Sequence, residues 1–394
     1  MSSKAYTSKP KILILCDYYP PGHESSGGMR TIVNTIDRLN AEFDFWVVTR
    51  YHKGVNYGSL KINTWNDVKN AKVLYIQKIT PFKLRKLIKS VVPSLIYSNS
   101  FFSTFTVNIV FLRKFKLING KIPLIIAPEG ELSKGSLSTK RMKKTLYMQL
   151  AKTLGLYKDV IWKVTSEMEK EEVRRFKEDE TEILIAPNMP SKEILPEFDV
   201  KAKPFKKRGE VRLVFLSRIH PVKNLKFLLK LLKINQGNIL LDVYGLKENE
   251  RYFEECLEMM KNLNGNVRAS FKGEIRNADV PLTLFDYHFF VLPTLGESFG
   301  HVIVEALSAG CPLIISDTTP WRRLEEKGIG WDLPLSDIER WQEVLNFCLN
   351  MDDAEYKEMS VRARNFIETW LKDSKVEEAT RKALMYSLDK TLRI

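Results

Sequence analysis

Short apolar runs alternate with longer segments of helical period along this chain, and that alternation most constrains its fold. Strands that alternate with helices form parallel sheets that helices cover on both faces. The runs of strand length and the segments whose apolar residues recur every three to four positions can be assigned directly. The pattern predicts strands at 12–15, 45–48, 73–76, 122–127, 183–185, 212–216, 239–244, 289–292 and 313–316, and helices at 30–39, 225–233, 250–263, 336–349 and 374–392.

The alternation stops and restarts around residues 188–209. This stretch is rich in proline and lysine and has no sustained period, as an interdomain linker would have, and a fresh strand follows it. The sequence therefore predicts an α/β protein of two Rossmann-like domains, residues 1–204 and 205–373, followed by a helical segment at 374–394. Two such domains facing each other would form a cleft, which is the usual place for a small-molecule site.

The composition is that of a globular protein: 394 residues, 44% hydrophobic and 28% charged. It excludes a disordered chain, a collagen and a polytopic membrane protein. The four cysteines lie far apart without a CxxC pair, which argues against a disulfide framework or a zinc ribbon and favours a reducing compartment. The apolar run at 12–15 is too short for a signal peptide. The uncharged stretch 91–112 is rich in Ser, Thr and Asn, so we expect a strand, a turn and a buried helix there. A cytoplasmic protein is predicted.

The positive charge is concentrated in one part of the chain. The net charge is +14, and residues 72–163 hold 18 basic residues against 3 acidic ones. Such a field attracts polyanions, which include nucleic acid, an anionic membrane leaflet and a phosphorylated substrate. The alternative is a basic surface that serves solubility alone. The chain has no zinc-finger, RRM-like or helix-turn-helix signature, so charge is the only argument for nucleic acid.

The most specific motif is VLPTLGESFGHVIVEALSAGCPLI at residues 291–314. It predicts a strand, a loop and then a helix at 299–309, with Ser298 as the N-cap. The free amides near Phe299 and Gly300, with the helix dipole behind them, would suit a phosphate. Gly300 lets a ligand approach the backbone closely because it has no Cβ.

Two carboxylates flank this predicted anion site. Glu297 and Glu305 are eight positions apart, which in a helix spans roughly 12 Å at about 1.5 Å per residue. That span is about the reach from a sugar to a ribose across a diphosphate. Carboxylates would repel the phosphates themselves, so they are better suited to accept hydrogen bonds from hydroxyls on either side. The alternative is a surface glutamate pair around an ordinary turn.

Two other motifs place cations or glycines after a strand. In LVFLSRIHPVKN, Arg218 and Lys223 lie on the predicted loop after a strand and could neutralise a diphosphate, or simply be solvated. In DYYPPGHESSGGMR, Gly27 and Gly28 precede a predicted helix, which suits a phosphate but also a flexible loop. Gly245 in VYG and Gly273 in FKGEI are weaker candidates for backbone contacts to a base.

Together these residues resemble the retaining, nucleotide-sugar-dependent glycosyltransferases of glycosyltransferase family 4, which have the GT-B fold. The resemblance is carried by SGGMR, SRIHPVKN, VYG, FKGEI and ESFGHVIVEALSAGCPLIISD, and it spans nearly the whole chain. The region from LIYSNSFFS to KKTLY and the stretch TTPWRRLEEKGIGW look like bacterial members that build surface polysaccharides. The resemblance implies a C-terminal domain that binds the donor, an N-terminal domain that binds the acceptor, and a last helix that crosses back to the N-terminal domain.

Residue roles follow from the same resemblance. It implies catalytic roles for Glu297, Arg218 and Lys223. It implies donor-binding roles for Gly27, Gly28, Gly245, Ser298, Phe299, Gly300 and Glu305. In such enzymes Glu297 would hold hydroxyls of the donor sugar and Glu305 the ribose. Arg218 and Lys223 would stabilise the leaving diphosphate.

The acceptor side departs from the family pattern. Relatives often have arginine where this chain has Glu129, and some have histidine or aspartate where it has Ser-Asn-Ser at 98–100. Asn99, Glu129 and Gly130 are the candidates on that side.

The five histidines are scattered and no D-x-D pair follows a strand, so we expect no cofactor and no metal. The expected partners are a nucleotide-sugar donor, a glycan or lipid-linked acceptor and an anionic membrane surface at 72–163. UDP is the default nucleotide. The alternatives are a non-catalytic sugar-nucleotide-binding module, a basic nucleic-acid-binding protein and another GT-B enzyme such as a sugar-nucleotide epimerase.

Overall fold

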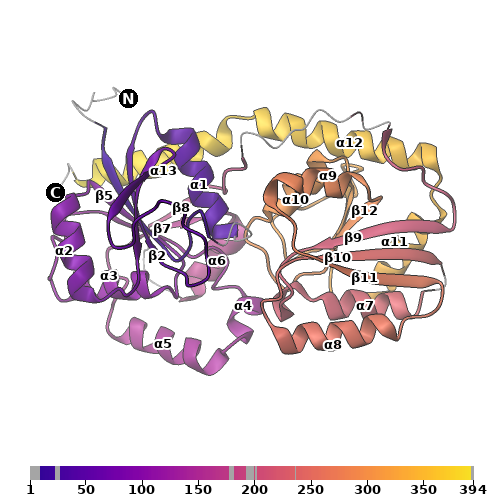
Figure 1. The fold of residues 1–394 in the computed structure, drawn as a ribbon, viewed down its shortest axis with the longest axis horizontal. Coiled ribbons are helices and arrows are strands. Elements are labelled where there is room, and N and C mark those ends of the chain that lie inside the picture. The colour runs from indigo at the N-terminus through magenta and orange to yellow at the C-terminus, as the bar shows by residue number, and fades with distance from the viewer. Residues whose placement is uncertain are drawn as a thin grey trace. The chain divides into compact units, whose positions relative to one another are not determined.

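The computed structural model describes residues 9–22, 27–176, 182–191, 199, 202–235 and 237–391, without the side chains of Lys390 and Thr391. The chain divides into two compact units (Figure 1). Unit 1 comprises residues 1–192 and 374–394, and unit 2 comprises residues 193–373. The division falls earlier than the junction at 204–205 that the sequence suggests. Part of the predicted linker at 188–209 lies outside the described residues.

Unit 1 is built on an eight-stranded sheet of order β3-β4-β2-β1-β5-β6-β7-β8, in which only the β3–β4 pair is antiparallel. Its strands are β1 (Lys11–Cys16), β2 (Asp44–Arg50), β3 (Trp65–Val68), β4 (Ala71–Ile76), β5 (Leu95–Asn99), β6 (Leu124–Ala127), β7 (Ile161–Val164) and β8 (Ile183–Ile185). Its helices are α1 (Gly27–Leu39), α2 (Pro81–Val91), α3 (Thr104–Lys114), α4 (Lys134–Ser138), α5 (Arg141–Thr153), α6 (Glu167–Phe176) and α13 (Lys375–Thr391).

Unit 2 is built on a six-stranded, wholly parallel sheet of order β11-β10-β9-β12-β13-β14. Its strands are β9 (Glu210–Leu216), β10 (Asn238–Tyr244), β11 (Val267–Gly273), β12 (Phe289–Leu292), β13 (Leu313–Ser316) and β14 (Gly330–Leu333). Its α-helices are α7 (Leu225–Lys233), α8 (Glu250–Lys261), α9 (Val280–Phe285), α10 (His301–Ser308), α11 (Ile338–Asn350) and α12 (Asp353–Lys372), with 3-10 helices η2 (Pro221–Lys223) and η3 (Asn277–Asp279). The predicted α/β class with two Rossmann-like domains is confirmed.

The predicted strands and helices are found, with small shifts of their ends, but four strands were not predicted. These are β3, β7, β11 and β14, whereas β5 lies in the stretch 91–112, where a strand was expected. Polar residues interrupt the apolar pattern in β5 and β7, and the structure gives these residues buried partners. In β5, the Ser98 hydroxyl lies 2.7 Å from the Thr106 hydroxyl. In β7, the Lys163 ammonium donates to the Asn188 side-chain oxygen over 2.5 Å. A buried polar group with a partner is tolerated, but the partner cannot be read from the strand itself.

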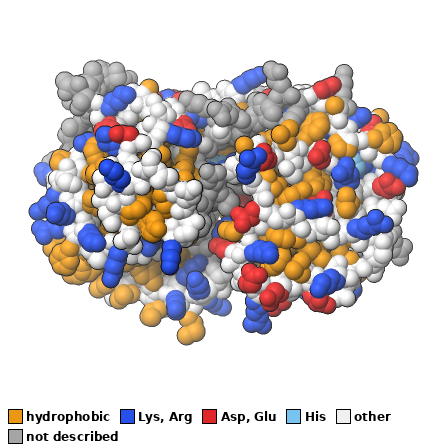
Figure 2. Space-filling model, in the orientation of Figure 1, with side chains coloured by type: hydrophobic (Ala, Val, Ile, Leu, Met, Phe, Trp, Pro, Cys, Tyr) orange, Lys and Arg blue, Asp and Glu red, His pale blue; other side chains and the backbone are white. Residues whose placement is uncertain are grey.

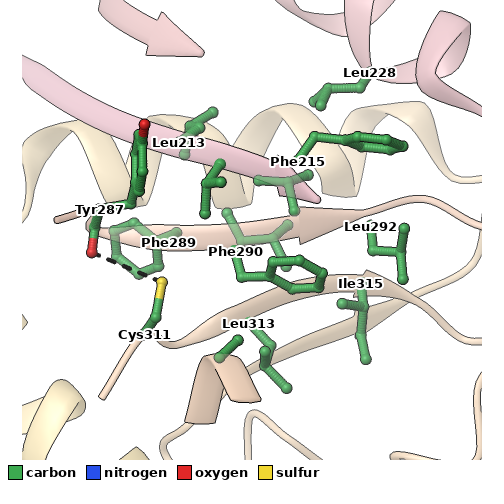
Figure 3. Packing of buried hydrophobic residues seen from close by; sticks show 14 of the residues in the cluster. Leu213, Phe215, Leu228, Tyr287, Phe289, Phe290, Leu292, Cys311, Leu313 and Ile315 are labelled. Carbon is green, nitrogen blue, oxygen red and sulfur yellow. Dashed lines mark hydrogen bonds between the residues drawn. The ribbon is translucent and has the colours of Figure 1, made fainter. Parts of the chain in front are cut away.

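The core of unit 2 lies between the central strands and the helices that cover them (Figure 3). Leu213 and Phe215 of β9, Phe289 of β12 and Leu313 of β13 pack in one cluster of buried residues. Helix α7 adds a leucine face of helical period to it. Lys203, which precedes β9, is joined to the same unit, because its ammonium donates to the carbonyls of Phe285 and Ala309.

The last helix, α13, packs on unit 1. Leu384 and Leu388 are buried in the same cluster as residues of β1 and β2. Arg381 pairs with Glu42 at 2.8 Å, and Glu377 pairs with Arg38 of α1 at 3.3 Å. Residues far apart in sequence therefore form one unit.

The stretch 91–112 forms β5, a turn and α3, as expected. No helix in the described part of the chain combines the length and the apolarity needed to cross a membrane. All four cysteines are buried and unpaired.

Candidate functional site

The loops that carry the predicted cations and carboxylates lie at one edge of the unit 2 sheet. Strands β10, β9 and β12 are parallel neighbours, so their carboxyl ends share that edge. Backbone hydrogen bonds join the loops there. The Ser217 amide donates to the Tyr244 carbonyl over 3.1 Å, and the Gly245 amide donates to the Gly273 carbonyl over 2.8 Å. In open parallel sheets this is the edge where ligands bind.

Lys223 and Glu297 form an ion pair at this edge. They come from loops after different strands, β9 and β12, and 74 residues of sequence separate them. Their side chains are only 9% and 16% exposed. The two loops are tied together because the Leu295 amide donates to the Val222 carbonyl over 2.7 Å. The structure thus brings together two residues that the sequence assigned to catalysis.

The loop between Glu297 and α10 differs from the prediction in its helix start. Gly300 is the N-cap of α10, with a left-handed backbone at φ 80° and ψ 70°. The helix therefore begins at His301, and the prediction of Ser298 as N-cap with a helix from Phe299 was wrong. A Cβ on Gly300 would lie 2.7 Å from Ile303 Cδ1. The left-handed turn and this close packing both require glycine.

The same correction applies to the spacing of the two glutamates. Glu297 lies in the loop before α10, so eight helical steps do not join it to Glu305, and the 12 Å estimate does not hold. Glu305 is inside the helix and 3% exposed, whereas the Glu297 carboxylate reaches Lys223. The two carboxylates thus have different surroundings.

Phe299 anchors the loop before α10 through ring contacts and a hydrogen bond. Its ring is buried and lies 4.9 Å from the His301 ring and 6.0 Å from the Trp321 ring. The Trp321 indole donates to the Phe299 carbonyl over 2.6 Å. The sequence analysis assigned no role to Trp321, because no local pattern ties it to a loop more than twenty residues earlier.

Arg218 forms an ion pair that is separate from the Lys223–Glu297 pair. Its guanidinium pairs with Glu248 at 2.5 Å, and both side chains are more exposed than those of the other pair. Glu248 follows β10, so this pair links the loops after two neighbouring strands. Sequence analysis did not single out Glu248.

Gly245 has a structural reason to be glycine. Its φ is 142°, and a Cβ there would lie 1.8 Å from the Ser217 carbonyl oxygen. Gly273 has a φ of 89°, and its carbonyl accepts a hydrogen bond from the Gly245 amide. Gly245 allows the loops after β9 and β10 to pack closely, whereas Gly273 is favoured by its left-handed φ alone, because a Cβ there would contact nothing within 4 Å. A donor contact is not needed to explain them.

In unit 1 the structure brings Gly28 together with Asn99. Gly27 and Gly28 are the first two residues of α1, and the Asn99 amide donates to the Gly28 carbonyl over 3.3 Å. A Cβ on Gly28 would lie 3.4 Å from Asn99 Oδ1, which is ordinary contact. Asn99 is the buried last residue of β5. A predicted donor-side glycine and a predicted acceptor-side residue thus meet at the carboxyl edge of this sheet.

Glu129 is part of a buried charged network beside that edge. The Asn188 amide donates to one Glu129 oxygen over 2.7 Å, and Lys163 donates to the Asn188 oxygen over 2.5 Å. The other Glu129 oxygen, Oε1, is buried without a hydrogen-bond partner. Burial raises the pKa of Glu129 to about 7, although Lys163 acts in the opposite direction. Burial also lowers the pKa of Lys163, which Glu129 partly offsets.

Gly130 is held by a second carboxylate. Its amide donates to Glu169 over 2.6 Å, and the Thr165 amide and hydroxyl donate to the other Glu169 oxygen. The sequence analysis singled out Glu129 and Gly130 but missed Lys163, Asn188 and Glu169. A lysine inside the strand IWKV was the one available signal, because a buried lysine needs a partner.

The Asp, Glu, His and Cys side chains of the described residues do not gather in any group of three that could hold a metal ion.

Comparison with known proteins agrees with this architecture. Residues 197–366, nearly all of unit 2, match the family "Glycosyl transferases group 1". No curated protein matches the chain. Among solved structures, sucrose-phosphate synthase from Thermosynechococcus elongatus has a TM-score of 0.72 at 16% identity, covering 96% of this chain and 98% of its own. HepE from Anabaena, in complex with UDP and glucose, has a TM-score of 0.66 at 14% identity, covering 96% and 100%.

WaaG, a glycosyltransferase involved in lipopolysaccharide biosynthesis, has a TM-score of 0.65 at 16% identity, covering 93% of this chain and 98% of its own. These likenesses show that the chain has the GT-B fold. Together with the family match in unit 2, they support a glycosyltransferase.

Proposed function

We propose that this protein is a retaining glycosyltransferase that moves a sugar from a nucleoside-diphosphate sugar to a hydroxyl group, without a metal. The observation that carries the proposal is the Lys223–Glu297 pair. A cation and a carboxylate from separate loops meet, mostly buried, at the ligand-binding edge of the unit 2 sheet, directly before the N-terminus of α10. Residues 197–366, which contain both, match a glycosyltransferase family.

The two charges suit different parts of a donor. Phosphate oxygens are negative, so Lys223, Arg218 and the first-turn amides of α10 would receive them. The Glu297 carboxylate would accept hydrogen bonds from sugar hydroxyls, and its ion pair with Lys223 would orient it. Arg218 is held by Glu248, so a diphosphate would take the place of Glu248 beside the guanidinium.

The transfer breaks the bond between the sugar's anomeric carbon and the diphosphate oxygen and forms a bond to the acceptor oxygen on the same face. The acceptor proton passes to a phosphate oxygen of the leaving group, so no protein base is assigned. Charge builds up on the diphosphate in the transition state, and preorganised cations there lower the barrier. Arg218 and Lys223 would supply that stabilisation.

UDP is the proposed nucleotide, which the UDP complexes of HepE support. Gly27, Gly28, Gly245, Ser298, Phe299, Gly300 and Glu305 are the proposed donor-binding residues. Asn99, Glu129 and Gly130 are proposed for the acceptor side, and the unpartnered Glu129 oxygen is the group there with unused hydrogen-bonding capacity.

The proposed acceptor is a glycan or a lipid-linked glycan of bacterial surface polysaccharide synthesis: capsule, O-antigen or exopolysaccharide. The protein would work in the cytoplasm at the inner face of the membrane. The basic stretch at 72–163, with 18 basic and 3 acidic residues, supports this position because an anionic leaflet attracts it.

Isothermal titration with UDP, GDP, ADP and dTDP tests the donor site. We expect one nucleotide to bind the wild type, and Lys223→Ala to weaken that binding at least tenfold, since one cation on a phosphate contributes about 1.5–3 kcal/mol. Lys261→Ala is the matched control, because Lys261 pairs with Glu258 at the end of α8, away from the ligand-binding edge. Equal binding by both variants would remove Lys223 from the site.

Measurements of donor consumption and of duplex-DNA binding beside the titration separate the alternatives. A non-catalytic module would bind the nucleotide but consume no donor sugar in any acceptor mixture. An epimerase would consume the donor without an acceptor. A nucleic-acid-binding protein would bind duplex DNA in a salt-dependent manner and show no nucleotide preference.

A further inference from the structure

We propose that α5 is a membrane-docking helix that lays an apolar stripe, flanked by basic residues, into the headgroup region of an anionic bilayer. This inference rests on the proposed function at the inner face of a membrane, and it names the surface that contacts the lipid. The basic stretch at 72–163 alone does not identify such a surface, because charge attracts a protein to a membrane but inserts no apolar group into it.

The stripe consists of the large apolar side chains on the outer face of α5. Met142, Leu146 and Leu150 are 87%, 68% and 54% exposed. They follow one another at intervals of four residues, so they form a line of roughly 12 Å along the helix. A row of exposed apolar residues on one helix face is a feature of surfaces that bind a partner or a membrane.

The inner face of α5 is fixed to unit 1, so the stripe is held outward. Ala151 is buried, and the Tyr147 hydroxyl lies 2.7 Å from the Tyr157 hydroxyl. The Lys144 ammonium donates to the Ser136 carbonyl over 2.6 Å and lies 5.0 Å from the Phe102 ring. An exposed stripe on an anchored helix loses little conformational freedom on docking.

The charge around the stripe identifies the partner as anionic. At 3.6 residues per turn, Lys143 falls beside the stripe, about 60° from its centre, and Lys152 and Arg141 lie on the other side of the helix, about 120° and 140° from that centre. All three are exposed. Between Glu131 and Asp159 the chain has seven basic residues and no acidic one. Interfacial helices have this pattern, since the apolar face enters the headgroup boundary while the basic flanks meet lipid phosphates.

The two views agree on where this surface lies. Figure 1 places α5 along the lower edge of unit 1. In Figure 2 hydrophobic and basic side chains lie side by side along that edge.

Sedimentation of the purified full-length protein with vesicles tests the proposal. We expect binding to phosphatidylcholine vesicles that contain about 30% phosphatidylglycerol, little binding to pure phosphatidylcholine, and weakening by salt. The double variant L146E/L150E should bind at least tenfold less. Leu282→Glu is the matched control, because Leu282 is 58% exposed on α9 of unit 2, and it should bind as the wild type does.

Three outcomes would overturn the proposal. The double variant could bind the anionic vesicles as well as the wild type, or wild-type binding could ignore lipid charge. In the third outcome, sedimentation velocity would show a wild-type dimer and a monomeric double variant while vesicle binding stays unchanged. The stripe would then bind a second copy of the chain. Circular dichroism checks that the variants fold. Vesicle binding needs no turnover, so loss of sugar transfer with intact docking would reject the proposed function alone.

Discussion

Each unit places a lysine near a glutamate at the carboxyl edge of its sheet, but the two arrangements differ. In unit 2, Lys223 and Glu297 are in direct contact, and both lie on loops. In unit 1, Lys163 reaches Glu129 only through the Asn188 amide, and the lysine is inside a strand. In the direct pair each charged group contacts its partner, whereas the bridged Glu129 carboxylate has a buried oxygen without a hydrogen-bond partner, and burial raises its pKa. The comparison teaches that the same two residue types can form either a direct ion pair or a bridged network in which the carboxyl group holds its proton more tightly.

Breaking the direct pair should have the largest effect. We expect Glu297→Ala or Lys223→Ala to lower turnover at least ~100-fold, which corresponds to about 3 kcal/mol of transition-state stabilisation. Each single variant leaves a mostly buried charge without its partner, so each should also unfold at a lower temperature than the wild type. Initial rates and thermal unfolding measure the two effects. If the double variant K223A/E297A is no more stable than the sum of the single changes predicts, the pair is not coupled.

The glycines at the two edges should respond in opposite directions. Gly245→Ala would place a Cβ 1.8 Å from the Ser217 carbonyl oxygen, on a backbone with a positive φ. We therefore expect the unfolding free energy to fall by about 3 kcal/mol or more. Gly28→Ala meets only ordinary contact with Asn99 in a helix, so we expect a gain of roughly 0.5–1 kcal/mol. Urea unfolding of both variants measures the difference. A destabilised Gly28→Ala protein would show that α1 begins differently.

The network of Lys163, Asn188 and Glu129 should make the unfolding free energy depend on pH. Burial raises the pKa of Glu129 from 4.5 to about 7, so the folded chain holds this proton more tightly than the unfolded chain does. The resulting stability is complete below pH 4.5 and is lost as the pH rises to about 7, by up to about 3 kcal/mol. Glu129→Gln should flatten the dependence of the unfolding free energy on pH in this window. An unchanged slope would place the titration on another group.

The exposed pair should have the smallest effect on stability. Arg218 and Glu248 are about two-fifths exposed, so Glu248→Gln should change the unfolding free energy by less than about 0.5 kcal/mol. Donor binding should instead improve a few-fold, because the diphosphate no longer competes with Glu248 for the guanidinium. Titration with UDP beside thermal unfolding measures both. Weaker nucleotide binding would mean that Glu248 positions Arg218 and does not compete for it.

Most of the fold and the loops that follow the unit 2 strands could be predicted from local sequence. Strands such as FFVL of β12 and the leucine face of α7 have patterns that need no distant partner. Strand β7 escaped prediction because Lys163 looks wrong in a buried strand until the acceptor of its hydrogen bond, the Asn188 side-chain oxygen, is known. The helix start at α10 escaped it too, because a left-handed Gly300 can end a loop where Ser298 looks like a better cap.

The sequence by itself determined that this protein has two parallel α/β units and that charged, glycine-rich loops follow the strands of the second. It could do so because strand and helix periods and turn residues act over a few positions. Only the tertiary structure decided that Lys223 meets Glu297, that Arg218 meets Glu248, and that Asn188 joins Lys163 to Glu129. Those contacts depend on which strands are neighbours in a sheet, and the pairing of strands distant in sequence is fixed by the packing of the whole unit.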